Sequence, residues 1–373
     1  MYRVNRISLT WVRIPLHEPF RISNGVVAEK DGIVVAVHSD GLTGHGESSP
    51  MAGNFYSADT PESCWEQLTS SLAPQTVGRS FDSLAAACQW LDAQPGSNFA
   101  KVGIETAFWD LEAQRRGIPL HRLLAEHVSE TPAAEARSGL AVGLYDTIPE
   151  LCQAIERQLG AGYHRVKIKI SRGHDLELVD AVRKAFGGTP LMTDANADYT
   201  LDHRSIFEQL DSKGLLMFEQ PLGGPMLAES AELQRSLRTP ICLDESLETL
   251  PDVEKAIALK SFRIGNIKIQ RVGGFYNALR VYRMLRDNGY SIWVGTMPEL
   301  GIGQAQGAAL STLPGCDYPT DVEASLRWFT SDYIEPFIEV RNGNIAMPDA
   351  PGLGYRIDGA QLARYRVASQ DFA

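Results

Sequence analysis

Paired cysteines are missing from this chain. Its five cysteines are scattered, and no two of them form a Cys-x-x-Cys pair. An odd number of scattered cysteines is typical of neither a disulfide framework nor a zinc site. We expect buried free thiols at these positions: Cys64, Cys88, Cys152, Cys242 and Cys316.

Long apolar runs and basic clusters are missing too. No stretch approaches the roughly 20 apolar residues of a membrane span, and residues 1–6 lack the apolar core of a signal peptide. The formal net charge is -11 and no cluster of Lys and Arg occurs, which argues against binding to nucleic acid. We therefore expect a cytoplasmic protein that forms a homo-oligomer, acts on a small molecule, and binds neither membranes nor nucleic acid.

Several common catalytic motifs are also absent. The sequence contains no Gly-x-Ser-x-Gly, Walker or His-Glu-x-x-His pattern, which are the marks of hydrolases, phosphate-loop enzymes and zinc proteases. Gly301-Ile302-Gly303 lacks the third glycine of a dinucleotide fingerprint, so a nicotinamide oxidoreductase is not expected.

What the chain does have is a series of charged residues at nearly constant spacing. Each ends a short apolar run typical of a strand, and the segments between carry helical patterns, as in residues 175–186 and 274–288. A period near 25 residues accommodates one strand, one helix and two loops, the unit of a (β/α) barrel. The sequence thus predicts charges at the carboxyl ends of five successive barrel strands, where barrel enzymes carry their active sites. These residues are Lys169, Asp194, Glu219, Asp244 and Lys268.

The rest of the chain is organised differently. At 373 residues it exceeds a barrel of roughly 250 residues. Residues 1–130 place strands first and helices after them, a pattern that favours an α+β domain. We expect the barrel to occupy residues 131–325 and the segment 326–373 to fold back onto the first domain.

The three carboxylates predict a metal site. Asp194, Glu219 and Asp244 have no Cys or His at matching positions, and an all-oxygen ligand set suits Mg²⁺, with Mn²⁺ as the alternative. Any one of them alone could cap a helix or form an ion pair, but three at equal intervals favour a shared ligand. Asn196 and Glu245 follow two of these ligands and are expected to orient them; a helix cap is the alternative for each.

The lysines indicate the chemistry. Lys167 and Lys169 alternate along one strand, so both face the buried interior. Burial together lowers their pKa unless carboxylates or a metal compensate, and a lowered pKa suits a general base; the alternative is that both extend to solvent. Lys268 is expected across the mouth from Lys169. A metal between two amines suits removal of the proton next to a carboxylate, giving an enediolate.

The order Lys-x-Lys, Asp, Glu, Asp, Lys resembles the enolase superfamily in its muconate-lactonizing subgroup. Residues 103–111 (GIETAFWDL) and 44–48 (GHGES) also match family segments, and the resemblance covers nearly the whole chain. Mandelate racemases would show a histidine base where Lys268 stands. The resemblance implies an α/β fold: a modified TIM barrel, (β/α)7β, with an N-terminal α+β capping domain completed by the C-terminal tail.

Within the subgroup, residues 266–274 and 297–303 look most like o-succinylbenzoate synthases and the related N-acylamino acid racemases. The resemblance implies that Lys169 removes the α-proton and then protonates the departing hydroxyl. Lys268 would stay cationic in this dehydration, which serves menaquinone biosynthesis, or act as the second base in racemisation. Lys167 is assigned to the same catalytic group.

Three alternatives to the synthase remain. N-succinylamino acid racemisation could be the main role. Asp321 and Glu323 resemble the acidic pair of dipeptide epimerases, which makes epimerisation another alternative. A non-catalytic binding barrel is the remote one, and the completeness of the five charged positions argues against it.

The resemblance also implies a set of substrate-binding residues. Two loops of the first domain, 19–25 and 49–57, are expected to close over the barrel mouth and exclude water. Plain packing at the domain interface is the alternative for their residues, and a surface position is the alternative for Arg271. The expected set is Arg271, Met297, Glu299, Phe20, Ser23, Met51 and Tyr56.

Overall fold

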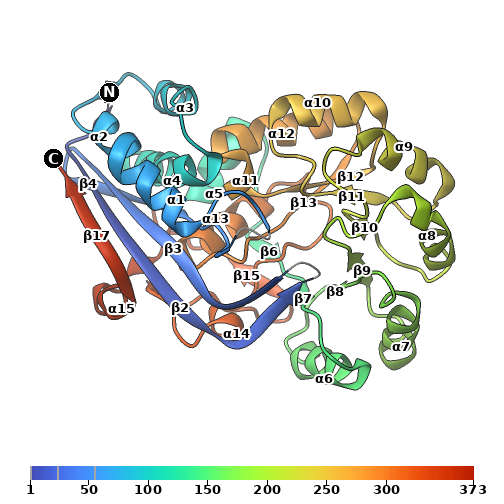
Figure 1. Ribbon diagram of the computed structural model, residues 1–373. Coiled ribbons are helices and arrows are strands. Elements are labelled where there is room, and N and C mark those ends of the chain that lie inside the picture. Colours follow the sequence, from blue (N-terminus) through green and yellow to red (C-terminus); the bar gives the residue numbers. More distant parts are fainter. Residues whose placement is uncertain (1, 23–24, 54–55) are drawn as a thin grey trace.

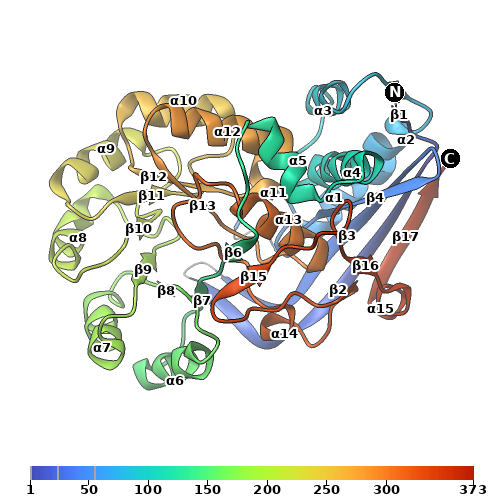
Figure 2. The same ribbon diagram turned by 180° about the vertical axis from the view of Figure 1, so that it is seen from behind.

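The computed structural model describes residues 2–22, 25–53 and 56–373. Figures 1 and 2 show two parts: a long antiparallel sheet with helices packed on it, and a barrel whose helices form an outer ring. The predicted α/β fold, a modified TIM barrel with an α+β capping domain, is confirmed.

Parallel strands form the barrel. Within the described residues, seven of them pair in the order β13-β12-β11-β10-β9-β8-β7. Residues 316–320 complete the ring between β13 and β7, because Cys316 forms a parallel bridge with Ile292 and Thr320 forms one with Ser138. The strands are β7 (Leu140–Val142), β8 (Val166–Lys169), β9 (Leu191–Asp194), β10 (Phe218–Glu219), β11 (Ile241–Leu243), β12 (Ile264–Ile267) and β13 (Ser291–Val294).

Helices connect these strands on the outside of the barrel. The predicted helices at 175–186 and 274–288 are confirmed to within one residue; Asp175 caps the first of them by accepting a hydrogen bond from Leu176 N (2.6 Å). No helix in the described part of the chain is long and apolar enough to cross a membrane. The connecting helices are α6 (Ile148–Leu159), α7 (Leu176–Phe186), η2 (Leu201–His203), α8 (Arg204–Leu210), α9 (Leu227–Ser236), α10 (Leu250–Leu259), α11 (Ile269–Val272), α12 (Phe275–Asp287) and α13 (Gly301–Ser311).

The barrel interior is apolar below and charged above. An apolar cluster of inward-facing residues fills its middle: Met192, Met217, Cys242, Ile264 and Trp293. Side chains two residues further along a strand face the same way, so Asp194, Glu219 and Asp244 lie one layer nearer the carboxyl ends. The pairing register aligns Asp194 with Lys169 on one side and with Glu219 on the other. The predicted ring of charges is therefore a consequence of strand register.

The capping domain is built on an antiparallel sheet of order β17-β2-β3-β4. Its last member, β17 (Arg366–Phe372), pairs with β2 (Arg6–Ile22), and Figure 1 shows the two side by side. The C-terminal tail thus completes the first domain, as predicted, while the exact borders at 130 and 325 stay a prediction. The remaining strands of this region are β1 (Tyr2–Arg3), β3 (Gly25–Ser39), β4 (Leu42–Ser48), β5 (Ser80–Phe81), β6 (Glu135–Arg137), β14 (Ile334–Glu335), β15 (Asn344–Ala346) and β16 (Arg356–Ile357).

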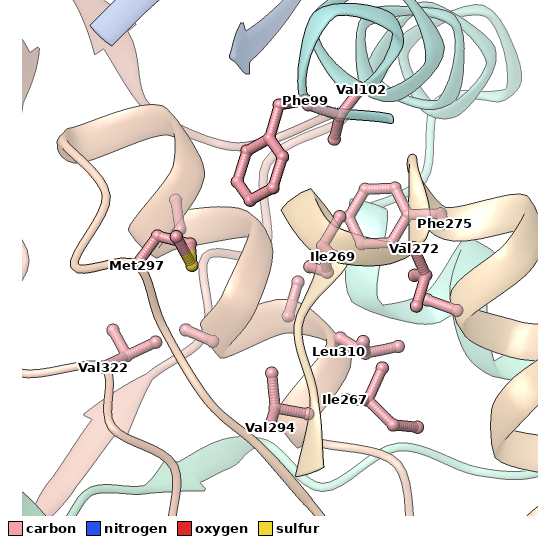
Figure 3. Packing of buried hydrophobic residues seen from close by; sticks show 14 of the residues in the cluster. Phe99, Val102, Ile267, Ile269, Val272, Phe275, Val294, Met297, Leu310 and Val322 are labelled. Atoms are coloured by element: carbon pink, nitrogen blue, oxygen red, sulfur yellow. The ribbon is translucent and has the colours of Figure 1, made fainter. Parts of the chain in front are cut away.

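Helices of the capping domain cover one face of this sheet and reach the barrel. Figure 3 shows Phe99 and Val102 of α4 beside Ile269, Val272 and Phe275 of the barrel. The two domains therefore share one apolar core at the level of α11 and α12. The helices are α1 (Pro61–Gln67), η1 (Leu68–Leu72), α2 (Ala73–Thr76), α3 (Leu84–Asp92), α4 (Asn98–Arg116), α5 (Leu120–His127), α14 (Ser325–Trp328) and α15 (Gly359–Arg364).

The close approach of β4 to α4 generates a prediction about Gly46. A Cβ atom at this position would lie 1.9 Å from the carbonyl oxygen of Gly103, and backbone cannot yield as a flexible side chain can. We expect Gly46→Ala to lower the free energy of unfolding by about 1–3 kcal/mol, the usual cost of overpacking, measured by urea denaturation. Gly160→Ala is the control, because a Cβ there meets nothing within 4 Å. Equal midpoints for Gly46→Ala and the wild type would contradict this packing.

Candidate active site

A cleft opens at the carboxyl ends of the barrel strands, under the capping domain. It brings together the three predicted catalytic lysines and four of the predicted substrate-binding residues, Phe20, Met51, Tyr56 and Met297. The other residues that line it are Ile22, Ala141, Thr296, Pro298, Asp321 and Trp328. One cleft therefore joins side chains from both domains.

Lys169 lies inside the site and does not extend to solvent, being only 6% exposed. Its Nζ donates to Asp194 Oδ2 (2.5 Å) and to Asn196 Oδ1 (2.8 Å). Burial alone would raise the pKa of Asp194, but the ammonium groups of Lys169 and Lys167 outweigh it and lower that pKa. Lys169, the first of the two predicted bases, is thus held by residues at the carboxyl end of the neighbouring strand β9.

Lys167 faces inward one layer below. Its Nζ donates to Asp321 and to Glu219 Oε2 (3.2 Å), and lies 5.0 Å from the ring centroid of Trp293. Burial lowers the pKa of Lys167, but these carboxylates outweigh burial and raise it. The expected lowering of the pKa therefore does not occur at Lys167, because neighbouring carboxylates compensate for its burial. Asp321 had been recognised only as half of an acidic pair.

Lys268 enters the cleft from the opposite side of the ring, on the far side of the carboxylate-bearing strands. Its Nζ pairs with Asp244 Oδ2 (2.7 Å) and donates to the hydroxyl of Tyr56 (2.7 Å). Burial lowers the pKa of Lys268, but Asp244, Tyr56 and Glu245 together outweigh burial and raise it. Arg271 donates to the same hydroxyl (2.8 Å). Tyr56 thus links the 49–57 loop to the charged mouth of the barrel.

The three carboxylates suit a divalent cation because their donor atoms are oxygens and because their negative charges repel one another. Burial, followed by the repulsion of Asp194, raises the pKa of Glu219 to about 8. Asp244 Oδ1 is buried and accepts no hydrogen bond within the described residues, although it forms an ion pair with Arg271 (3.3 Å). No three acidic, His or Cys side chains of the described chain form a ready metal cluster, and lysine ammonium groups lie against the carboxylates instead. Hard oxygen donors whose charges repel one another fit Mg²⁺ or Mn²⁺.

Asn196 and Glu245 connect two of these strand ends. Asn196 Nδ2 donates to Glu245 Oε1 (3.1 Å), and its backbone N–H donates to Asp194 Oδ1 (2.9 Å). Burial and the neighbouring Asp244 raise the pKa of Glu245 to about 7. The two residues therefore lie where groups that orient the carboxylates would be expected.

Two predicted substrate-binding residues do not line the cleft. Glu299 turns back to accept a hydrogen bond from Met297 N (2.9 Å), and burial raises its pKa to about 7. Arg271 is buried, which rules out the surface alternative; it donates to the hydroxyl of Tyr56 and pairs with Asp244 Oδ1 (3.3 Å). Ser23 lies outside the described residues.

The predicted loop at 19–25 is wrong for residues 19–22, which are the end of strand β2 paired with β3, and this strand end contributes an aromatic wall. The ring of Phe20 meets Trp328 edge-on, with centroids 4.8 Å apart, and lies 5.9 Å from Lys169 Nζ. Sequence reasoning missed Trp328 and Ile22 as lining residues, since neither has a chemical signal and Trp328 lies on the four-residue helix α14 beyond the barrel.

Comparison with known proteins agrees with this geometry. Residues 6–125 match the N-terminal domain model of mandelate racemase and muconate lactonizing enzyme, and residues 150–361 match the enolase C-terminal domain-like model. The chain is 39% identical to an o-succinylbenzoate synthase of Geobacillus kaustophilus, over 97% of this chain and 96% of the relative.

Two further relatives extend the comparison. An N-succinylamino acid racemase of Thermus thermophilus is 34% identical over 95% of both chains. The solved structure of an enolase superfamily member from Listeria innocua superposes with a TM-score of 0.93 at 30% identity, covering 100% of this chain and 99% of that one. The chain belongs to the mandelate racemase and muconate lactonizing enzyme family of the enolase superfamily.

Proposed function

We propose that the protein is an o-succinylbenzoate synthase that uses Mg²⁺, with Mn²⁺ as the alternative, and that it also racemises N-succinylamino acids. The observation that carries this proposal is a cleft in which Lys169 and Lys268 enter from opposite sides of a set of buried carboxylates. The similarity to o-succinylbenzoate synthases along nearly the whole chain supports the same reaction.

Lys169 performs the proton transfers in this proposal. Its neutral Nζ takes the proton from the carbon next to the substrate carboxylate and then gives a proton to the hydroxyl, which leaves as water. One C–H and one C–O bond break; the C–H electron pair becomes the new ring C=C bond, and the C–O pair leaves with the water oxygen. Asn196 Oδ1 holds the Nζ through a hydrogen bond, while Asp194, which pairs with the Nζ here, would turn to the cation and leave the amine free to act as the general base. Lys268 remains an ammonium on the other face.

The carboxylates have a separate part. Asp194, Glu219 and Asp244 would hold the cation, which when bound supplies positive charge against the second negative charge that develops as the substrate carboxylate becomes an enediolate. Asn196 and Glu245 would orient this set through the hydrogen bond between them. Lys167, kept cationic by Asp321, adds positive charge from below.

Racemisation follows from the second lysine. When the substrate carries no leaving hydroxyl, a proton removed by one lysine is replaced by the other from the opposite face, which inverts the carbon. This is the specific observation that favours N-succinylamino acid racemase as a second activity, in line with the relative of that name.

The dipeptide epimerase alternative finds less support. An epimerase would use the acidic pair to hold a substrate ammonium. Here Asp321 already accepts hydrogen bonds from Lys167 and Arg165, and Glu323 accepts one from Ala141 N (2.7 Å) and pairs with Arg327 (2.9 Å). Both carboxylates therefore have cationic partners from the protein itself.

The proposal also includes two predictions from the sequence, on the location and the assembly of the protein, for which there is no direct observation. We place the enzyme in the cytoplasm and expect a homo-oligomer.

The substrate would contact four of the predicted residues: Phe20, Met51, Tyr56 and Met297. Arg271 would act through Tyr56, and Glu299 would act through Met297.

The substrate can be tested directly. With Mg²⁺, the protein is expected to dehydrate 2-succinyl-6-hydroxy-2,4-cyclohexadiene-1-carboxylate, followed by ultraviolet absorbance of the aromatic product. It is also expected to exchange the α-proton of N-succinylamino acids in D₂O, followed by NMR, and to leave dipeptides unchanged. Faster turnover of dipeptides than of the other two classes would contradict the proposal.

The base can be tested by removing its amine. Lys169→Ala should lower the dehydration rate at least about 10²-fold, because a positioned general base contributes about 10²–10⁴-fold. Lys213→Ala is the matched control, since Lys213 pairs only with Asp180 on the outside of the barrel (2.6 Å). Dehydration by Lys169→Ala at the wild-type rate would show that another group is the base.

The cation can be tested by chelation. Removal of divalent ions should abolish dehydration, and Mg²⁺ or Mn²⁺ should restore it. Added Mg²⁺ should also raise the midpoint of thermal unfolding of the wild type, because a ligand that binds only the folded state stabilises it. Glu219→Gln should lose most of that rise. Full activity after exhaustive chelation would rule out the metal.

A further inference from the structure

Gln270 spans the seam between the barrel and the capping domain. It is 1% exposed and lies on α11, two residues after Lys268. Its Oε1 accepts a hydrogen bond from Ser49 N (2.8 Å), and its Nε2 donates to the carbonyl oxygen of Glu47 (2.9 Å). Both ends of one side-chain amide therefore bond the backbone at the end of β4, as a neighbouring strand would.

Further buried hydrogen bonds hold the backbone to which Gln270 is bonded. Lys30, 1% exposed on β3, donates to the carbonyl oxygens of Ser49 (3.0 Å) and Pro50 (2.7 Å). The side chain of Glu47 accepts hydrogen bonds from the backbone N–H groups of Leu300 (2.8 Å) and Gly303 (2.9 Å), where α13 begins. Several hydrogen bonds therefore hold residues 47–50 in place against both β3 and α13.

The loop that contacts Lys268 begins in this same segment, residues 47–50. The 49–57 loop starts at Ser49, and its Tyr56 accepts a hydrogen bond from Lys268 Nζ. Figure 3 shows Ile269 beside Phe99 of α4, so the backbone next to Gln270 is also packed on the capping domain. Lys268 is consequently set at its tip by Tyr56 and by Asp244 of the barrel, and near its backbone by Gln270.

Lys169 is positioned in another way. It lies on β8, and its Nζ donates hydrogen bonds to Asp194 and Asn196, which both belong to the barrel. A change at the junction of Gln270 with residues 47–50 therefore acts on one lysine of the pair and leaves the supports of the other in place.

We propose that Gln270 is a positioning residue for Lys268 and that it sets proton transfer on one face of the substrate selectively. The inference rests on the proposed function, since it concerns the two faces of an N-succinylamino acid. Loss of the amide frees α11 to move against the 49–57 loop, and a displacement of about 1 Å can cost up to about 10²-fold in rate.

The test compares the two enantiomers of one N-succinylamino acid. Each presents its α-proton to one lysine, and Lys169→Ala and Lys268→Ala assign which enantiomer belongs to which. Gln270→Met, which keeps the length and removes both hydrogen bonds, should slow exchange of the Lys268 enantiomer in D₂O about tenfold. Exchange of the Lys169 enantiomer should change by less than about twofold, which is the size of a generic perturbation.

A matched control is available in Gln234. It is also a buried glutamine that bonds backbone, with Oε1 accepting from Ile241 N (2.6 Å), but its partners all lie in the barrel wall. Gln234→Met should leave the ratio of the two exchange rates unchanged. Because both rates come from one preparation, partial unfolding lowers both and does not alter the ratio.

The outcomes separate the inference from the proposed function. Equal slowing of both enantiomers in Gln270→Met would overturn the positioning role alone. A wild-type protein that exchanges neither enantiomer would overturn the two-lysine site and the inference with it. If Gln270→Met does not fold, Gln270→Asn gives the same test, since its shorter amide cannot reach both backbone partners and should shift the ratio in the same direction.

Discussion

Charged side chains are buried at the mouth of this barrel, and each such group needs a partner of opposite charge or a hydrogen bond to offset its lost hydration. Lys169 pairs with Asp194, Lys268 with Asp244, and Lys167 bridges to Asp321 on the segment that closes the ring. Any ligand that enters must exchange these contacts for its own. Under the proposed function, an anionic substrate with its cation would replace these internal ion pairs.

The same principle operates at the seam between the domains. Buried carboxylates of the capping domain accept backbone N–H groups of barrel helices: Glu47 those of α13, and Glu105 those of Phe275 and Tyr276 at the start of α12 (2.8 Å each). Such contacts satisfy donors that a helix leaves free at its first turn. They also fix the orientation of the capping domain over the cleft, which is why its side chains can line the cleft.

The positions of the barrel strands and of the charged residues at their ends could be predicted from the sequence, because each depends on local alternation and a constant repeat length. The direction of the pKa shift of Lys167 could not, because Asp321 lies 154 positions away and only the closed ring brings the two together. Gln270 gave no signal either, since its partner Glu47 is 223 positions away and the bonds go to backbone. Trp328 was missed for a similar reason: an apolar wall residue has no chemical mark.

The central claim is that two lysines face one substrate carbon from opposite sides, next to a cation held by three carboxylates. A crystal structure with Mg²⁺ and o-succinylbenzoate tests it most directly. The account predicts the ion on Asp194, Glu219 and Asp244, with Lys169 Nζ and Lys268 Nζ on opposite faces of the product ring carbon that bears the carboxylate. A metal bound elsewhere, or a ligand outside the cleft with both lysines still paired to Asp194 and Asp244, would contradict it.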